Sequence, residues 1–167
     1  MTAHTDPPER TAEPLNHLRA DGTAHMVDIS SKQVTAREAT ATGKVRLSAA
    51  AVRALREGTA PKGDALGVAR LAGILAAKKT PDLVPLAHPV AVHAVEVDLA
   101  VVDDGVELRA TVRTADRTGI EMEALTAVSV AALAMVDMIK AVDKLAVITD
   151  VMVVAKSGGR SGDWTRR

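Results

Sequence analysis

Cysteine is absent from the 167-residue chain, and one tryptophan is its only aromatic residue. Without cysteine the protein has no disulfide bond, no thiolate metal cluster and no cysteine nucleophile. A single aromatic ring argues against the stacking platforms that bind single-stranded nucleic acids. Acidic and basic residues number 21 each, so the formal net charge is zero. This balance disfavours a general binder of nucleic acid or of anionic membranes.

Sequence motifs for common cofactors are also missing. The chain has no G-x-x-x-x-G-K-[ST] and no G-x-G-x-x-G after a strand, and its acidic residues and histidines lack metal-ligand spacing. We therefore expect no cofactor and no metal. The first residues are polar and proline-bearing, with no apolar targeting core. We expect a disordered tail over 1–21, a single domain over 22–167 and a cytoplasmic location.

The longest apolar stretch lies between Thr118 and Lys144. Thr118 followed by Glu121 has the spacing of a capping box, which predicts a helix start. No charged residue occurs from Ala124 to Val136, whereas a surface helix shows one polar face, so we expect a helix buried on all sides. The uncharged run is shorter than the roughly 20 residues of a membrane span.

The rest of the chain combines strand and helix patterns. Ser48 and Asp64 stand before apolar-periodic segments and are expected to cap two further helices. Asp104-Gly105 is expected to form a hairpin turn. Alternating residues predict strands at 26–29, 34–47, 93–101, 106–113 and 147–155. This order predicts an α+β fold, in which helices pack on one face of an antiparallel sheet.

Ionisable residues gather at the two ends of the long helix. Glu121 and Glu123 at its start either stabilise the positive N-terminus of the helix or reach one cavity together. Asp137 and Lys140 at its end are neighbours on one face. They form either an exposed ion pair or an acid–base pair with pKa values shifted by burial. The residues alone leave both alternatives open.

Three further features carry weaker signals. His88 precedes Pro89, and a lone loop histidine is more often structural than catalytic. The Lys62-Gly63-Asp64 loop and the SGGRSG loop at 157–162 can each hold an anion through a cation and exposed backbone N–H groups. These residues favour an enzyme for a phosphorylated, anionic small molecule. The alternative is a non-catalytic nucleotide-binding or assembly module, whose uncharged helix is an oligomer core.

Four segments, together spanning about His25 to Trp164, resemble the cyclic pyranopterin monophosphate synthases of molybdenum cofactor biosynthesis. They are HMVDIS, KGDALGVARLAGILAAKKTPDLVPLAHPV, TGIEMEALTAVSVAALAMVDMIKAVDK and AKSGGRSGDW. The resemblance implies a ferredoxin-like fold and a hexamer built from three dimers. It implies a lyase that converts 3′,8-cyclo-7,8-dihydro-GTP to cyclic pyranopterin monophosphate with release of pyrophosphate. It also implies a functional link to the radical SAM enzyme that makes this substrate.

The same resemblance implies roles for individual residues. Catalytic roles fall on Lys62 of the K-G-D motif and on Asp137 and Lys140 of the D-M-x-K motif. Substrate-binding roles fall on Leu86, Ala87, His88, Glu121, Met122, Glu123, Arg37, Arg70, Lys78 and Lys156. Two positions depart from the family pattern. Ala87 stands where many members have cysteine, which argues against an essential thiol, and Val136 stands where an aromatic residue is common.

The length of the helix predicts a shared site. Glu123 and Asp137 are fourteen residues apart, which is about 21 Å along a helix and too far for both to touch the same reacting atoms. Two such helices packed antiparallel about a two-fold axis would bring unlike ends together. We therefore expect an obligate homo-oligomer with active sites composed of residues from two chains.

Overall fold

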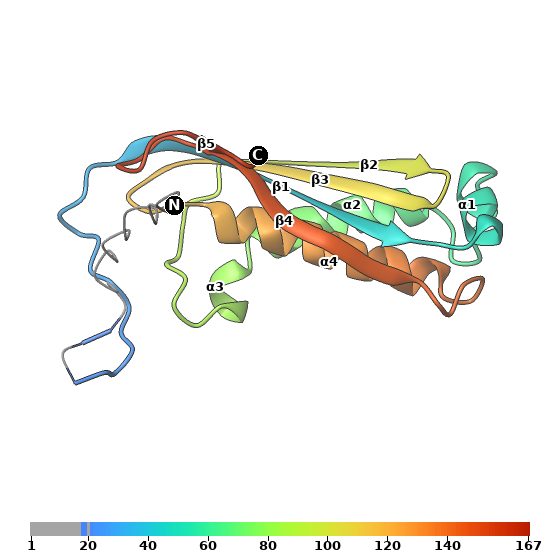
Figure 1. Cartoon of the computed structure of the whole chain (residues 1–167), viewed down its shortest axis with the longest axis horizontal. Helices are drawn as coiled ribbons and strands as arrows, with labels where there is room; N and C mark the ends of the chain where they lie inside the picture. The colour runs from blue at the N-terminus through green and yellow to red at the C-terminus, as the bar shows by residue number, and fades with distance from the viewer. Residues whose placement is uncertain (1–17, 20) are drawn as a thin grey trace, which may run out of the picture.

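One antiparallel sheet with helices on one face forms the architecture of the computed structural model (Figure 1), which describes residues 18–19 and 21–167. The expectation of a disordered tail concerns residues that are largely outside this described part. The strands are β1 Thr35–Arg46, β2 Ala94–Val102, β3 Gly105–Asp116, β4 Val147–Ser157 and β5 Trp164–Thr165. The helices are α1 Ala49–Arg56, α2 Ala65–Ala77, α3 Thr80–Leu83 and α4 Glu121–Ile139.

The strand order β2-β3-β1-β4-β5 confirms the α+β prediction. β1 pairs with both β3 and β4, and every named strand pair is antiparallel. Leaving out the short β5, the chain runs β-α-β-β-α-β, which is the ferredoxin-like arrangement. The sequence did not indicate β5, because a two-residue strand is too short to show alternation.

Two of the three predicted helix starts are confirmed. The Ser48 side chain accepts a hydrogen bond from the Ala51 N–H at 3.4 Å, and Asp64 accepts one from the Gly67 N–H at 2.8 Å. The third prediction is wrong. The cap position of α4 is Ile120, which has no side-chain capping bond, so Thr118 lies before the cap.

Two strand-level predictions also need correction. No strand forms at 26–29, where the Val27 carbonyl bonds to the His88 side chain instead of to a neighbouring strand. The hairpin turn consists of Asp103 and Asp104, because Gly105 already pairs with Val102 as the first residue of β3. The other extended segments become the named strands to within a few residues.

The core lies between the sheet and the helix pair α2 and α4. Strand positions that face the helices, such as Val45, Val106 and Val112, are fully buried. The two helices approach closely because small residues meet between them. A Cβ added to Gly73 of α2 would lie 2.9 Å from the Ala127 carbonyl oxygen of α4. Close packing therefore depends on the missing side chain at residue 73.

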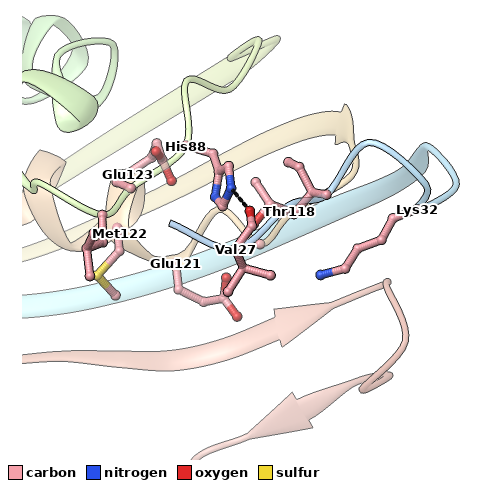
Figure 2. Close-up of a pocket in the computed structure, with 11 residues that line it drawn as sticks. Val27, Lys32, His88, Thr118, Glu121, Met122 and Glu123 are labelled. Atoms are coloured by element: carbon pink, nitrogen blue, oxygen red, sulfur yellow. Dashed lines mark hydrogen bonds between the residues drawn. The ribbon is translucent and has the colours of Figure 1, made fainter. Parts of the chain in front are cut away.

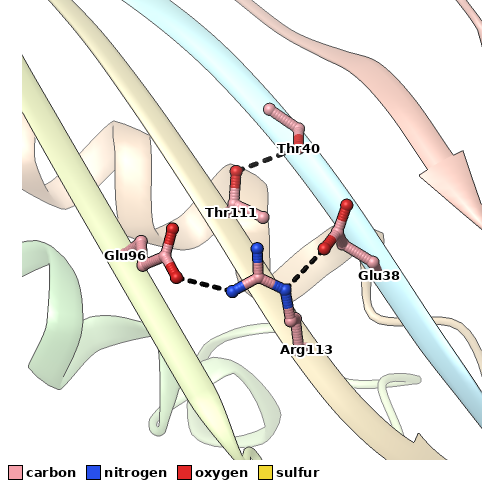
Figure 3. A network of polar contacts seen from close by, with 5 residues as sticks. All are labelled: Glu38, Thr40, Glu96, Thr111 and Arg113. Atoms are coloured by element: carbon pink, nitrogen blue, oxygen red, sulfur yellow. Dashed lines mark hydrogen bonds and ion pairs between the residues drawn. The ribbon is translucent and has the colours of Figure 1, made fainter.

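Polar side chains occupy the sheet face that is turned away from the helices. Arg113 of β3 lies between two carboxylates and bonds to Glu38 of β1 and to Glu96 of β2 (Figure 3). Beside them, the hydroxyls of Thr40 and Thr111 lie 3.0 Å apart. This inside–outside alternation is the pattern that the sequence predicted for the strands.

The prediction that the long helix is buried on all sides is wrong for the isolated chain. Its exposed face carries Met122, Ser129 and Leu133, and Leu133 is 60% exposed. The neighbouring α2 likewise exposes Leu71 and Leu75. By length and composition alone α4 could cross a membrane. Half of it is nevertheless buried against the sheet and α2, which identifies it as a core helix.

Candidate active site

The charged residues of α4 form two clusters, one at each end of the helix. At its N-terminal end, a cavity of about 520 Å³ opens beside the loop that precedes β2 (Figure 2). Six of the predicted substrate-binding residues line it: Leu86, Ala87, His88, Glu121, Met122 and Glu123. The fold therefore brings the loop motif and the helix-start motif together, although they are far apart in the sequence.

The two carboxylates of this cavity differ in their environments. Glu123 is 2% exposed, and its burial, with a smaller contribution from the charge of Glu121, raises the pKa of the Glu123 carboxyl. Glu121 forms an ion pair with Lys156 of β4 at 3.2 Å. Its carboxylate folds back over Gly119, where a Cβ would lie only 2.0 Å from Oε2. Both residues line the cavity, although Glu121 is already the first residue of α4.

His88 is held by the backbone of the segment that precedes β1. Its Nε2 lies 2.6 Å from the Val27 carbonyl oxygen (Figure 2). A carbonyl oxygen only accepts, so Nε2 carries the hydrogen of this bond. His88 therefore lines the cavity and at the same time holds Val27, another lining residue, in place.

The C-terminal end of α4 carries the second cluster. The Asp137 carboxylate lies 2.8 Å from the Lys140 ammonium and 2.7 Å from that of Lys62, in the loop that follows α1. Hydrogen bonds from Lys140 and Lys62 hold the pKa of the Asp137 carboxyl at about 2. The Asp137 side chain is 52% exposed in the isolated chain. The ion-pair alternative is confirmed, and the lowered pKa comes from the two cations rather than from burial.

Within one chain the two clusters remain apart. They occupy opposite ends of the 19-residue α4 (Figure 1), and the rise of a helix separates Glu123 from Asp137 by about 21 Å. A single copy therefore presents two incomplete sets of ionisable groups.

The remaining predicted residues fall into two groups. Arg37 and Lys156 line a small cavity of about 130 Å³ that adjoins Glu121. Arg70 donates to the Val97 carbonyl at 3.0 Å on the edge strand β2, and Lys78 is the C-cap residue of α2. Neither Arg70 nor Lys78 lines the cavities at the start of α4, and their substrate-binding roles stay predictions.

The cavity also contains residues to which the sequence assigned no role in the site. Val27, Ile29, Lys32, Thr118 and Gly119 complete its lining. Thr118 and Gly119 belong to the helix-start motif, so their position could have been inferred. The lysine at 32 stands in a polar stretch without periodicity, and no sequence signal marked it. In the described part of the chain, no group of three or more His, Asp or Glu side chains is placed to hold a metal ion.

Comparisons with known proteins identify the family of the chain. Residues 26–159 match the model of the MoaC family. The cyclic pyranopterin monophosphate synthase of Streptomyces coelicolor is 62% identical over 96% of this chain and 92% of its own length. The synthase of a Nocardioides species is 60% identical over 97% of this chain and 99% of its own length. The synthase of Corynebacterium glutamicum is 55% identical over 90% of this chain and 97% of its own length. The chain therefore belongs to the MoaC family.

Proposed function

We propose that the chain is a cyclic pyranopterin monophosphate synthase of molybdenum cofactor biosynthesis, a lyase of the cytoplasm. The observation that carries this proposal is 62% identity to a synthase of that name over nearly the whole chain. The structure adds support, because the residues with acid–base and anion-binding chemistry gather at the two ends of α4. The substrate is 3′,8-cyclo-7,8-dihydro-GTP, which the radical SAM partner enzyme supplies.

The reaction rebuilds the purine-derived rings as a pterin and closes a cyclic phosphate. Proton transfers accompany the opening and reclosing of the rings, with no net redox change, so the chemistry calls for no redox cofactor. In the last step of the reaction, a hydroxyl of the substrate loses its proton and attacks the phosphorus nearest the ribose. The bond from that phosphorus to the bridging oxygen breaks, and pyrophosphate leaves with the electron pair.

The roles in the second cluster, Lys62, Asp137 and Lys140, follow from the surroundings of the Asp137 carboxylate. A carboxyl with a pKa of about 2 is a weak base at neutral pH, so Asp137 acts mainly as the charge that orients two ammonium groups. Lys62 and Lys140 then exchange protons with the substrate. Each lies within 2.8 Å of Asp137, so either lysine can lose its proton while the other keeps the carboxylate paired.

The first cluster, Glu121 and Glu123 at the start of α4, recognises the purine-derived part of the substrate. Burial raises the pKa of Glu123, which favours its protonated form, and a carboxylic acid can donate a hydrogen bond to a ring carbonyl or nitrogen. Glu121 is paired with Lys156 and offers an accepting oxygen for the exocyclic amino group. The cationic residues next to this cavity serve the phosphates.

A homo-oligomer completes the site. Two copies of α4 packed antiparallel place the first cluster of one chain beside the second cluster of the other. The exposed apolar face with Leu71, Leu75 and Leu133 supports such burial between copies, because a monomer rarely exposes a large apolar patch. We expect a hexamer of three dimers, in which each site draws on two chains.

A turnover assay tests the proposal. The purified protein is mixed with 3′,8-cyclo-7,8-dihydro-GTP, and pyrophosphate release is followed with time. We expect stoichiometric release by the wild type and a loss of about 10²–10⁴-fold for Lys62→Gln, which keeps the size but removes the titratable amine. Substrate binding without any pyrophosphate release, in a correctly assembled wild type, would instead favour the non-catalytic nucleotide-binding or assembly module.

A further inference from the structure

The loop that supplies one wall of the active-site cavity has no regular secondary structure where it enters β2. Residues 87–93 form neither helix nor strand, yet Ala87 and His88 line the cavity. A segment without backbone ladder bonds keeps a fixed position only where other groups hold it. One such attachment is the bond between His88 and the Val27 carbonyl (Figure 2). Further attachments lie at the end of β3.

Two side chains of β3 hold both backbone polar groups of Ala91. The Thr114 hydroxyl donates to the Ala91 carbonyl oxygen at 2.6 Å, and the Asp116 carboxylate accepts a hydrogen bond from the Ala91 N–H at 3.3 Å. The backbone pairing of β2 with β3 begins at Ala94, opposite Arg113. Three residues further along each strand, Ala91 comes opposite Asp116. There side-chain bonds replace the backbone ladder.

The Thr114 hydroxyl is buried and has one short acceptor. Thr114 is 5% exposed, and a buried hydroxyl requires a hydrogen-bond partner. Its Oγ1 also lies 3.4 Å from Nδ1 of His93, which accepts a hydrogen bond from the Ala115 N–H at 3.3 Å. Because a hydroxyl has a single hydrogen, the shorter contact to Ala91 receives it. The loop is therefore fixed to β3 at both Ala91 and His93.

A short and stiff stretch of chain connects Ala91 to His88. Only Pro89 and Val90 stand between them. The Pro89 ring fixes its own φ at about −65° and restricts the backbone conformation of His88. A displacement of Ala91 therefore displaces His88 in the cavity.

The same end of β3 leads to the opposite wall of the cavity. β3 ends at Asp116, residues 118–119 line the cavity, and α4 begins at Glu121. The Asp116 carboxylate also accepts a hydrogen bond from the Arg117 N–H at 2.7 Å. One carboxylate thus bonds both to the loop wall and to the segment that enters α4. The distance between the two walls depends on this carboxylate and on Thr114.

We infer, on the basis of the proposed function, that Thr114 and Asp116 are positioning residues: through Ala91 they place His88 and the loop wall for substrate binding. Both lie outside the four segments that resemble the family motifs. Neither side chain lines the active-site cavity, so each acts on the substrate only through the backbone that it holds. A displaced loop loses contacts that the substrate makes in the ground state and in the transition state alike. Loss of such contacts raises KM and leaves kcat unchanged.

Steady-state kinetics with the cyclised GTP substrate and hydrogen–deuterium exchange of the full-length protein test this role. The variants are Thr114→Val, which keeps the shape but removes the hydroxyl, and Asp116→Asn, which keeps one accepting oxygen. The matched control is Thr111→Val, on the same strand but on the outer sheet face, where the hydroxyl contacts Thr40 (Figure 3). In both variants we expect KM to rise about tenfold, kcat to stay within about twofold, and exchange to quicken only in residues 84–93. The control should behave like the wild type.

Two comparisons distinguish an effect on position from effects on packing and on charge. Thr114→Ser restores the hydroxyl and should restore the wild-type KM, whereas a packing defect would grow with the smaller side chain. Asp116→Asn removes a negative charge, which by itself would favour the anionic substrate and lower KM. Thermal unfolding checks that every variant folds. If Thr114→Val does not fold, Thr114→Ser and Asp116→Asn, whose side chain is partly exposed, provide the test.

The outcomes separate this inference from the proposed function. An unchanged KM in Thr114→Val and Asp116→Asn, or an equal rise in Thr111→Val, overturns the positioning role, while turnover by the wild type still supports the function. A wild type that releases no pyrophosphate overturns the proposed function, and hydrogen exchange then decides on the anchoring of the loop. Faster exchange confined to residues 84–93 supports this anchoring, and unchanged exchange overturns it.

Discussion

Asp143 shows how a single side chain joins distant parts of the fold. It is 7% exposed and accepts hydrogen bonds from the Ser48 N–H at 2.6 Å and from the Leu145 N–H at 2.9 Å. It therefore ties the turn after α4 to the start of α1. The bond from Ser48 and that from Leu145 lower the pKa of the Asp143 carboxyl, against the opposing effect of burial.

The first prediction concerns stability and pH. Asp143→Asn keeps one accepting oxygen and leaves one backbone N–H without its partner, so we expect a loss of about 1–3 kcal/mol in the free energy of unfolding at pH 7. A lowered folded-state pKa stabilises the protein above the unfolded value of about 4, and this contribution is lost as pH falls through the folded value. The difference between wild type and variant should therefore shrink below pH 4.

Urea unfolding at several pH values measures this effect. Asp103→Asn is the control, because Asp103 forms only an exposed ion pair with Arg56 and should leave the unfolding midpoint unchanged. If the difference in unfolding free energy between wild type and Asp143→Asn stays constant down to pH 3, the charge of Asp143 does not have this role.

The second prediction concerns the proton chemistry of Lys140. Lys140→Arg keeps a positive charge beside Asp137 but replaces the amine with a guanidinium, which stays protonated in proteins. We expect kcat to fall about 10²–10⁴-fold, while the pKa of Asp137, followed by NMR of its carboxyl, stays low. Lys140→Gln should instead raise the Asp137 pKa above its value of about 2. Near wild-type kcat in Lys140→Arg would remove Lys140 from proton transfer.

At the scale of elements, the packing of α2 on α4 holds the two clusters in place. α4 carries residues of both clusters, and α2 connects the loop that contains Lys62 to the loop that leads to His88. The distance between the two helices is set by small residues, with Gly73 facing Ala127 and Ala131.

The third prediction tests this packing through the direction in which Gly73→Ala changes the stability. In an exposed helix, Gly→Ala stabilises by about 1 kcal/mol through helix propensity. At Gly73 an added Cβ would meet the Ala127 carbonyl oxygen at 2.9 Å, and overpacking costs about 1–3 kcal/mol. We expect Gly73→Ala to lower the thermal unfolding midpoint. The control Ser129→Ala, on the exposed face of α4, should not lower this midpoint. A higher midpoint for the Gly73→Ala variant would show that the two helices can move apart without cost.

At the scale of the whole molecule, one chain separates groups that the proposed reaction needs together. Glu123 and His88 lie at one end of α4, and Lys62, Asp137 and Lys140 lie at the other. Lys62 and Asp137 form an ion pair within a single chain, so we expect them to contribute to the same site. The proposed pairing of two copies across a two-fold axis would unite the clusters without unfolding α4.

The fourth prediction uses mixed assemblies. Asp137→Ala and Glu123→Ala, each expected to be inactive alone, are unfolded together and reassembled. If a site combines the two ends of α4 from different chains, random pairing restores about a quarter of wild-type activity. Asp137→Ala mixed with Lys62→Ala is the control and should recover nothing, because both residues belong to one cluster. Absence of recovery in the first mixture, with subunit exchange demonstrated by mass spectrometry, would place each complete site in one chain.

The sequence by itself determined the elements with strong local signals. Ser48 and Asp64 cap helices because their side chains reach N–H groups only three residues away. The alternation from residue 93 to 113 shows a half-buried hairpin for the same local reason. The family and its motif residues were also readable, because long motifs do not depend on knowing the fold.

Only the tertiary structure decided how these motifs meet. Thr118 and Glu121 fitted a capping box, yet the Glu121 carboxylate turns to Lys156 of β4, a partner that local spacing cannot reveal. Lys32, Arg117 and Arg160 stand in three separate segments and line one cavity, because the start of β1 and the ends of β3 and β4 lie at the same end of the sheet. A shared electrostatic environment depends on distance in space, and chain folding, rather than spacing along the sequence, determines that distance.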